Sequence, residues 1–296
     1  MDRTPVPNIA TLKEMVHSRK LSRDRRAWYA WSRRLSIHIT WLLLHFPVSA
    51  NQVTIASVLL ALAGVCLMAS ARPWIALAGA AALLAHHFLD KVDGDIARFR
   101  GTYSLRGVYV DDLGHAISGG GILLALGLHL ARGAGASAAI PLLATGAIGG
   151  LAVVIGNQSK NAGFLLFSRA VLAQPELLPA QRSSSSLEAL SRQATHRDRG
   201  ARPDAAPGRA LWISRLRDAV LIAADYTLLL PLVAAGLLVE AVTRNSTFLV
   251  WLLAAECALQ LAVLAALIVI NYTVNVENES LRLDAVVRSR SDDEPR

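Results

Sequence analysis

The chain has 296 residues, of which 53% are hydrophobic and 18% charged, and its formal net charge is +8. Its mean hydropathy of +0.40 is high for a soluble domain, and the apolar residues are gathered into long runs. These properties exclude an ordinary soluble enzyme and predict an all-α, polytopic membrane protein with six transmembrane helices and an N-terminal interfacial helix.

Basic and aromatic residues alternate in the N-terminal segment, residues 1–47. Arg33 and Arg34 stand beside Trp28 and Trp31, and the apolar run that follows ends at Pro47. This pattern predicts an amphipathic helix that lies in the lipid headgroup region and ends before the proline. A solvated basic arm is the alternative. Because the aromatic residues continue directly into membrane spans, we expect no nucleic-acid binding.

Six apolar runs follow, and each is long enough to cross a bilayer. They extend from about Asn51 to Ser70, Trp74 to Arg98, Gly107 to Leu130, Ser137 to Gly156, Asp218 to Val242 and Thr247 to Ile270. Together they predict a six-helix membrane domain over residues 48–275. Residues 180–212, rich in Ser, Arg, Ala and Pro, read as a mobile cytoplasmic loop, and residues 276–296 as a polar cytoplasmic tail.

Lysine and arginine are distributed unevenly around these spans. The short links after the first, third and fifth spans contain Arg72, Arg132 and Arg244, whereas the other basic residues fall on the opposite side. By the positive-inside rule, both termini face the cytoplasm. We therefore expect an integral protein of the bacterial inner membrane. Contact with anionic membrane lipids would follow from the same charges, although a topology signal alone explains them equally well.

Carboxylates gather where the second span ends and the third begins. Asp90 and Asp93 are three residues apart, and Asp111 and His115 are four apart, so each pair shares one face of a helix. Two antiparallel helices can direct all four side chains at one point. Charged groups in a membrane span are costly, by about 2.5–3.5 kcal/mol each at the helix centre on insertion scales, and a divalent cation with oxygen ligands would relieve the repulsion between these carboxylates. The pattern predicts a metal site facing the cytoplasm.

This spacing resembles the signature of the membrane CDP-alcohol phosphotransferases. The matching positions are Asp90, Asp93, Gly94, Ala97, Arg98, Gly107 and Asp111, and His115 stands where the family usually has a fourth aspartate. The resemblance is specific over residues 90–115 and extends loosely through the span pattern. It implies a transferase that moves a phosphoalcohol group, most often phosphatidyl, from a CDP-alcohol such as CDP-diacylglycerol to an alcohol acceptor. CMP is released, the products are phospholipids, and the enzyme is a homodimer.

The resemblance also implies a role for each motif residue. Asp90, Asp93 and Asp111 would bind the metal, Mg²⁺ or Mn²⁺, as a pair of ions. Gly94, Arg98, Gly107 and Ser104 would hold the CDP moiety. The residue at position 115 would be the general base, and histidine can serve either as a base at neutral pH or as a metal ligand.

Two further pairs of residues are candidates for substrate binding. Asn51 and Thr54 open the first span in a segment that looks like the family's usual entry, where they could reach the nucleotide or simply cap the helix. Asn157 and Lys160 follow the fourth span. They could bind the acceptor or anchor the chain at the interface.

Alternatives to an active transferase stay open. Loss of the fourth carboxylate could leave a degenerate family member that binds nucleotide without turnover. Intramembrane carboxylates also occur in cation-coupled membrane transporters, but a transporter has no need for the spacing of Gly94, Ala97 and Arg98 beside them. The sequence does not distinguish CDP-diacylglycerol from a soluble CDP-alcohol as the donor.

Overall fold

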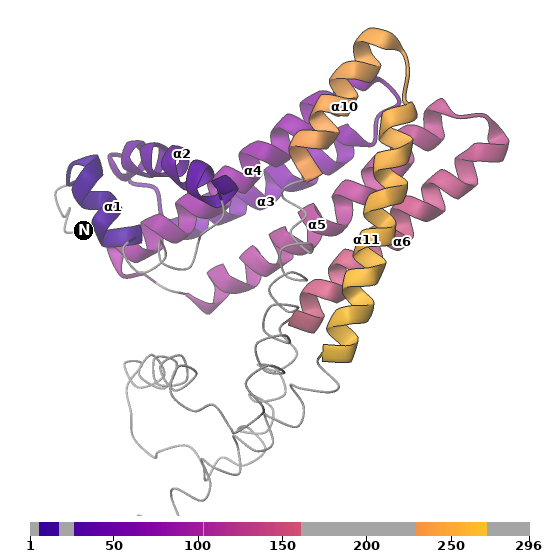
Figure 1. The fold of residues 1–296 in the computed structure, drawn as a ribbon. Helices are drawn as coiled ribbons and strands as arrows, with labels where there is room; N and C mark the ends of the chain where they lie inside the picture. The colour runs from indigo at the N-terminus through magenta and orange to yellow at the C-terminus, as the bar shows by residue number, and fades with distance from the viewer. Residues whose placement is uncertain (1–5, 18–26, 103, 161–228, 271–296) are drawn as a thin grey trace, which may run out of the picture. The chain divides into compact units, whose positions relative to one another are not determined.

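The computed structural model describes residues 6–17, 27–102, 104–160 and 229–270 of the chain. Every regular element in these ranges is an α-helix (Figure 1). The helices are α1 (Ile9–His17), α2 (Ala27–Leu44), α3 (Ala50–Met68), α4 (Pro73–Arg100), α5 (Leu105–Gly133), α6 (Ala136–Lys160), α10 (Leu229–Thr243) and α11 (Thr247–Ile270). The predicted all-α fold is confirmed.

Five of the described helices are long and apolar enough to cross a membrane, namely α3, α4, α5, α6 and α11. A sixth, α10, is apolar but only 15 residues long. The predicted fifth span began near Asp218, and its first part lies outside the described residues, as do the predicted loop 180–212 and the tail 276–296. The protein is therefore a polytopic membrane protein, as expected.

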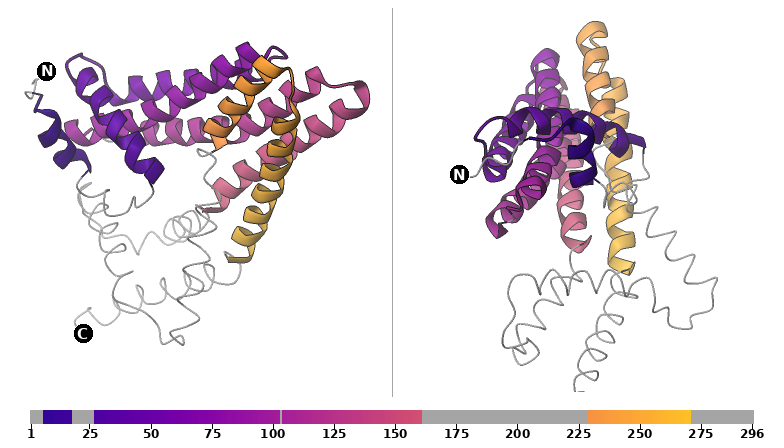
Figure 2. Two further views of the ribbon diagram at one scale, coloured as in Figure 1. Left: turned by 45° about the horizontal axis from the view of Figure 1, so that its top comes forward. Right: turned by 90° about the vertical axis from the view of Figure 1, so that its left-hand side faces the viewer.

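The N-terminal segment forms two helices where the sequence predicted one. The predicted interfacial helix corresponds to α2, which ends at Leu44, shortly before Pro47. The short helix α1 was not anticipated, and Figure 2 shows it next to α2 at the N-terminal end of the chain. That α2 lies in the headgroup region stays a prediction.

The chain divides into two compact units, and the motif lies in the unit made of residues 1–154 and 225–261. Within it, α3 packs against both α4 and α5. Glycines permit this closeness: a Cβ at Gly79 would lie 2.6 Å from the carbonyl oxygen of Gly64, and a Cβ at Gly64 would lie 2.8 Å from Leu83 Cγ. Without a strong hydrophobic force between helices in lipid, such small residues favour close backbone packing.

Local signals fix the ends of the helices that carry the motif. Ser49 and Gln52 form a capping box at the start of α3. Pro73 occupies the first turn of α4, where its missing N–H costs nothing. Gly101 ends α4 with a φ of 65°, a left-handed conformation that glycine adopts without strain. The end of α4 and the start of α5 both lie close to the start of α3, since residues of all three line one pocket.

Candidate active site

A pocket of about 150 Å³ lies where the start of α3, the end of α4 and the start of α5 meet. Its lining residues are Ala50, Asn51, Thr54, Asp93, Gly94, Ala97, Thr102, Ser104, Gly107, Val108 and Asp111. The structure therefore brings together most of the residues predicted to hold the CDP moiety, along with two of the predicted metal ligands.

One wall of the pocket is built by hydrogen bonds between the starts of α3 and α5. The backbone N–H of Gly107 donates to Ser104 Oγ over 3.0 Å, which caps α5. The Ser104 hydroxyl in turn donates to Asn51 Oδ1 over 3.1 Å. A Cβ at Gly107 would lie only 2.9 Å from that same oxygen, so a side chain at this position would displace the amide of Asn51.

Thr54 is joined to the motif aspartate Asp93. Its hydroxyl lies 2.6 Å from Asp93 Oδ2 and 3.1 Å from the carbonyl oxygen of Ala50. A hydroxyl has only one hydrogen to donate, and the shorter contact, to the charged acceptor, is the stronger of the two. The Thr54 hydroxyl therefore donates to Asp93 Oδ2. Both side chains are buried, at 5% and 7% exposure. Thr54 thus holds a motif carboxylate in place at the pocket, rather than only capping its own helix.

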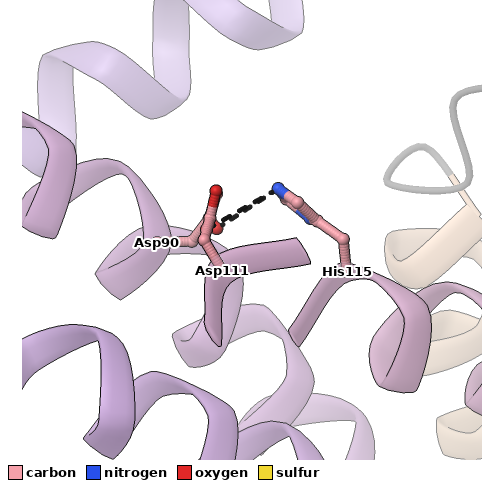
Figure 3. A group of neighbouring side chains, drawn as sticks. All are labelled: Asp90, Asp111 and His115. Carbon is pink, nitrogen blue, oxygen red and sulfur yellow. Dashed lines mark ion pairs between the residues drawn. The ribbon is translucent and has the colours of Figure 1, made fainter. Parts of the chain in front are cut away.

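Beside the pocket, Asp90 from α4 converges with Asp111 and His115 from α5 (Figure 3). One ligand atom from each of the three side chains lies within 4.8 Å of the others. His115 Nε2 is 3.5 Å from Asp90 Oδ1 and 3.8 Å from Asp111 Oδ1. Two carboxylate oxygens and one imidazole nitrogen form a donor set that fits a divalent metal ion.

Asp111 belongs to both this cluster and the pocket, and it therefore connects the two. Asp93 lines the pocket with Asp111 but is not part of the three-residue cluster. His115 is the third member of that cluster, with its side chain 42% exposed. The predicted ligand set of Asp90, Asp93 and Asp111 is thus divided between the cluster and the pocket wall, and its role in metal binding stays a prediction.

Arg98, also predicted to hold the CDP moiety, is not among the pocket-lining residues. Its Nη2 donates to Asp95 Oδ1, and its Nη1 lies 3.2 Å from the position of a Cβ at Gly94, which does line the pocket. Within the described part of the chain, the buried Nε of Arg98 has no hydrogen-bond partner. The guanidinium therefore lies against the pocket wall with donor capacity left over.

The predicted acceptor residues Asn157 and Lys160 lie at the end of α6. They belong to the second compact unit, residues 155–224 and 262–296. Their role in acceptor binding stays a prediction.

Sequence reasoning missed a buried contact behind the cluster. Ser57 Oγ lies 2.7 Å from His86 Nδ1, and a Cβ at Gly114 would lie 3.5 Å from the His86 ring. The signal available in the sequence was that His86 precedes Asp90 by one helical turn. The contact orients the imidazole of His86, which lies on the same helix as Asp90. The His86 ring is also close to Gly114, the residue before His115.

The sequence also matches a known protein family over the same helices. Residues 47–163 match the family model for CDP-alcohol phosphatidyltransferase. No curated protein matches the chain. The matched range begins just before α3 and includes every residue of the pocket and of the three-residue cluster, while α1 and α2 lie outside it. Residues 47–163 therefore correspond to a CDP-alcohol phosphatidyltransferase domain.

Proposed function

We propose that the chain transfers a phosphatidyl group from CDP-diacylglycerol to an alcohol acceptor and releases CMP, as a step in phospholipid biosynthesis. The observation that carries the proposal is Asp111, which lines the pocket for the nucleotide and also belongs to the carboxylate and imidazole cluster. A substrate held in the pocket would therefore present its diphosphate to the cluster.

The pocket wall suits a cytidine diphosphate. Gly94 and Gly107 carry no side chains, so a ligand can approach the backbone of α4 and α5 closely. Asn51 and Ser104 offer polar groups beside Gly107. Arg98 Nη1 lies 3.2 Å from the position of a Cβ at Gly94, and a guanidinium pairs well with phosphate oxygens.

A divalent metal ion is part of the proposal. Asp90 and Asp111 would hold it, Asp93 would hold a second ion at the pocket wall, and His115 Nε2 would not bind the metal. The ion, Mg²⁺ or Mn²⁺, would offset the negative charge that develops on the departing CMP. The donor set supports this because carboxylate oxygens are preferred ligands of both metals.

His115 is the proposed general base. The acceptor hydroxyl oxygen bonds to the phosphorus that carries the lipid, the bond from that phosphorus to the CMP oxygen breaks, and the hydroxyl proton passes to His115 Nε2. That nitrogen is near two carboxylates, at 3.5 and 3.8 Å, which would stabilise the resulting imidazolium. The half-exposed side chain can meet an acceptor that arrives from water.

The membrane arrangement follows from the charges and the apolar faces. The excess of Lys and Arg on one side supports cytoplasmic termini and a cytoplasmic active site. Exposed apolar side chains of α3, among them Ile55, Leu59 and Leu62, suit contact with lipid or with a second copy of the chain. We propose a homodimer on the basis of the family match.

Acceptor-dependent CMP release tests this proposal. Purified protein in detergent with Mg²⁺ is given CDP-diacylglycerol or soluble CDP-alcohols, together with a panel of alcohols and alcohol phosphates. We expect release from CDP-diacylglycerol that is lost in Asp111→Asn and kept in Asp112→Asn, since Asp112 is an exposed neighbour outside the pocket and the cluster. Equal release by the two variants, or none by wild type, would contradict it. Cation-coupled transport by the protein in vesicles, without CMP release, would instead favour a membrane transporter.

A further inference from the structure

The N-terminal helices, which lie outside the matched family domain, are docked against the motif helix α4 (Figure 1). Leu12 and Val16 of α1 are buried in one apolar cluster with Val92 and Ile96 of α4, all at 3% exposure or less. The indole N–H of Trp41 in α2 donates to the carbonyl oxygen of Pro7 over 3.1 Å, just before α1 begins. The segment is thus part of the protein core at this end of α4, rather than a free arm.

A buried carboxylate connects α1 to the motif. His17 Nε2, at the end of α1, lies 3.0 Å from Asp95 Oδ2, with 1% of one side chain and none of the other exposed. Because a carboxylate only accepts hydrogen bonds, the imidazole Nε2 is the donor. Asp95 is not a motif position, but it stands between Asp93 and Arg98 on α4.

The other oxygen of Asp95 accepts from the guanidinium of Arg98. A third neighbour contributes little: the Thr40 hydroxyl is 3.5 Å from Asp95 Oδ2 but donates its one hydrogen to the carbonyl oxygen of Ser36 over 3.0 Å. The Asp95 carboxylate therefore bridges His17 of α1 and Arg98 of α4, with one oxygen for each.

The bridge determines where the guanidinium of Arg98 lies. One Nη is committed to Asp95, and the other lies 3.2 Å from the position of a Cβ at Gly94, which lines the pocket. Rotation of the Asp95 side chain would move the Arg98 guanidinium with it, because the two form a direct hydrogen-bonded ion pair. A buried ion pair is often no better for stability than an apolar contact of the same volume, so a purely stabilising role explains the bridge poorly.

We propose that His17 and Asp95 are positioning residues for the donor substrate: through Asp95, the N-terminal helix holds the guanidinium of Arg98 at the nucleotide pocket. This inference rests on the proposed function, because it assigns Arg98 to the diphosphate of the donor. It makes α1, which lies outside the matched range, a part of the support of the active site.

The test compares His17→Ala, His17→Gln and the control His38→Ala, an exposed histidine on α2. Four quantities are measured for each: the KM for CDP-diacylglycerol, the KM for the acceptor, kcat, and the Kd of CMP without acceptor. His17→Ala should raise both the donor KM and the CMP Kd about tenfold, the effect of one charged hydrogen bond, with kcat and the acceptor KM unchanged. His17→Gln, whose amide can donate to Asp95, should recover most of the loss, and His38→Ala should match wild type.

Coupling to Arg98 supplies the second readout. In an Arg98→Ala background, His17→Ala should change neither the donor KM nor the CMP Kd, because its effect passes through Arg98. Equal effects of His17→Ala in both backgrounds would overturn the proposal, as would a fall in kcat or folded protein at an unchanged CMP Kd. If wild type shows no turnover but binds CMP, and His17→Ala weakens that binding, the proposed function fails and the positioning role stands.

Discussion

Replacing Thr54 with valine removes one hydroxyl from the pocket wall and keeps the shape of the side chain. That hydroxyl lies 2.6 Å from Asp93 Oδ2, within the range of about 2.5–2.7 Å typical of a hydroxyl bonded to a carboxylate. Asp93 is only 7% exposed, so water does not readily replace the lost donor. The Asp93 carboxylate would be left buried with one partner fewer.

The expected cost follows from the type of bond. A hydrogen bond to a charged group contributes about 1.5–3 kcal/mol, so Thr54→Val should lower the free energy of unfolding by that amount. For a protein of this size, at roughly 2–4 °C per kcal/mol, the Tm should fall by about 3–12 °C. Thr54→Ser keeps the hydroxyl and removes one methyl group, which costs about 0.8 kcal/mol.

Thermal unfolding of the purified variants in detergent measures the difference. We expect Thr54→Val to be less stable than Thr54→Ser, and the gap between them to shrink in an Asp93→Asn background, where the charged acceptor is gone. If valine and serine have the same Tm, or if the gap persists without the carboxylate, the bond between Thr54 and Asp93 does not hold the pocket wall as described.

Three further predictions follow from the packing and the cluster. Gly79→Val should lower the free energy of unfolding by about 1–3 kcal/mol or more, because a Cβ would lie 2.6 Å from the carbonyl oxygen of Gly64. Gly133→Ala, with open space around it near the end of α5, should not lower the Tm. Equal Tm values for the two variants would contradict the tight packing of α3 on α4. Gly107→Ala should weaken CMP binding about tenfold, because the added methyl group would displace Asn51. The Tm should stay close to that of wild type, because alanine favours a helix over glycine by about 1 kcal/mol. An unchanged CMP Kd would refute this prediction. Chelation with EDTA should abolish CMP release and added Mg²⁺ or Mn²⁺ should restore it, whereas full activity in EDTA would exclude the proposed metal.

Much of the architecture could be predicted because it is recorded in local patterns. The apolar runs gave the membrane helices, and the turn residues after Phe99 indicated that α4 and α5 meet at one end. The convergence of Asp90 with Asp111 and His115 followed from spacings of three and four residues on two helices. Such periodic patterns can be recognised in the sequence without knowledge of the rest of the fold.

Contacts between distant segments could not be predicted in this way. His17 and Asp95 are 78 residues apart in the sequence, and no periodicity connects them. Arg98 was expected at the phosphates, but a long side chain with several donors selects its partners in three dimensions, and here one donor is taken by Asp95. The role of Thr54 as the partner of Asp93, 39 residues away, was missed for the same reason.

The measurement that tests the central claim most directly is acceptor-dependent CMP release from CDP-diacylglycerol by wild type, His115→Ala and His115→Asp. We predict that wild type is active, that His115→Ala loses at least about a hundredfold in kcat, as expected for a general base, and that His115→Asp keeps activity. A silent wild type beside an active His115→Asp would show that the chain binds nucleotide but has lost its native catalysis. Undiminished activity of His115→Ala would show that the base is another residue and would contradict the account of the site.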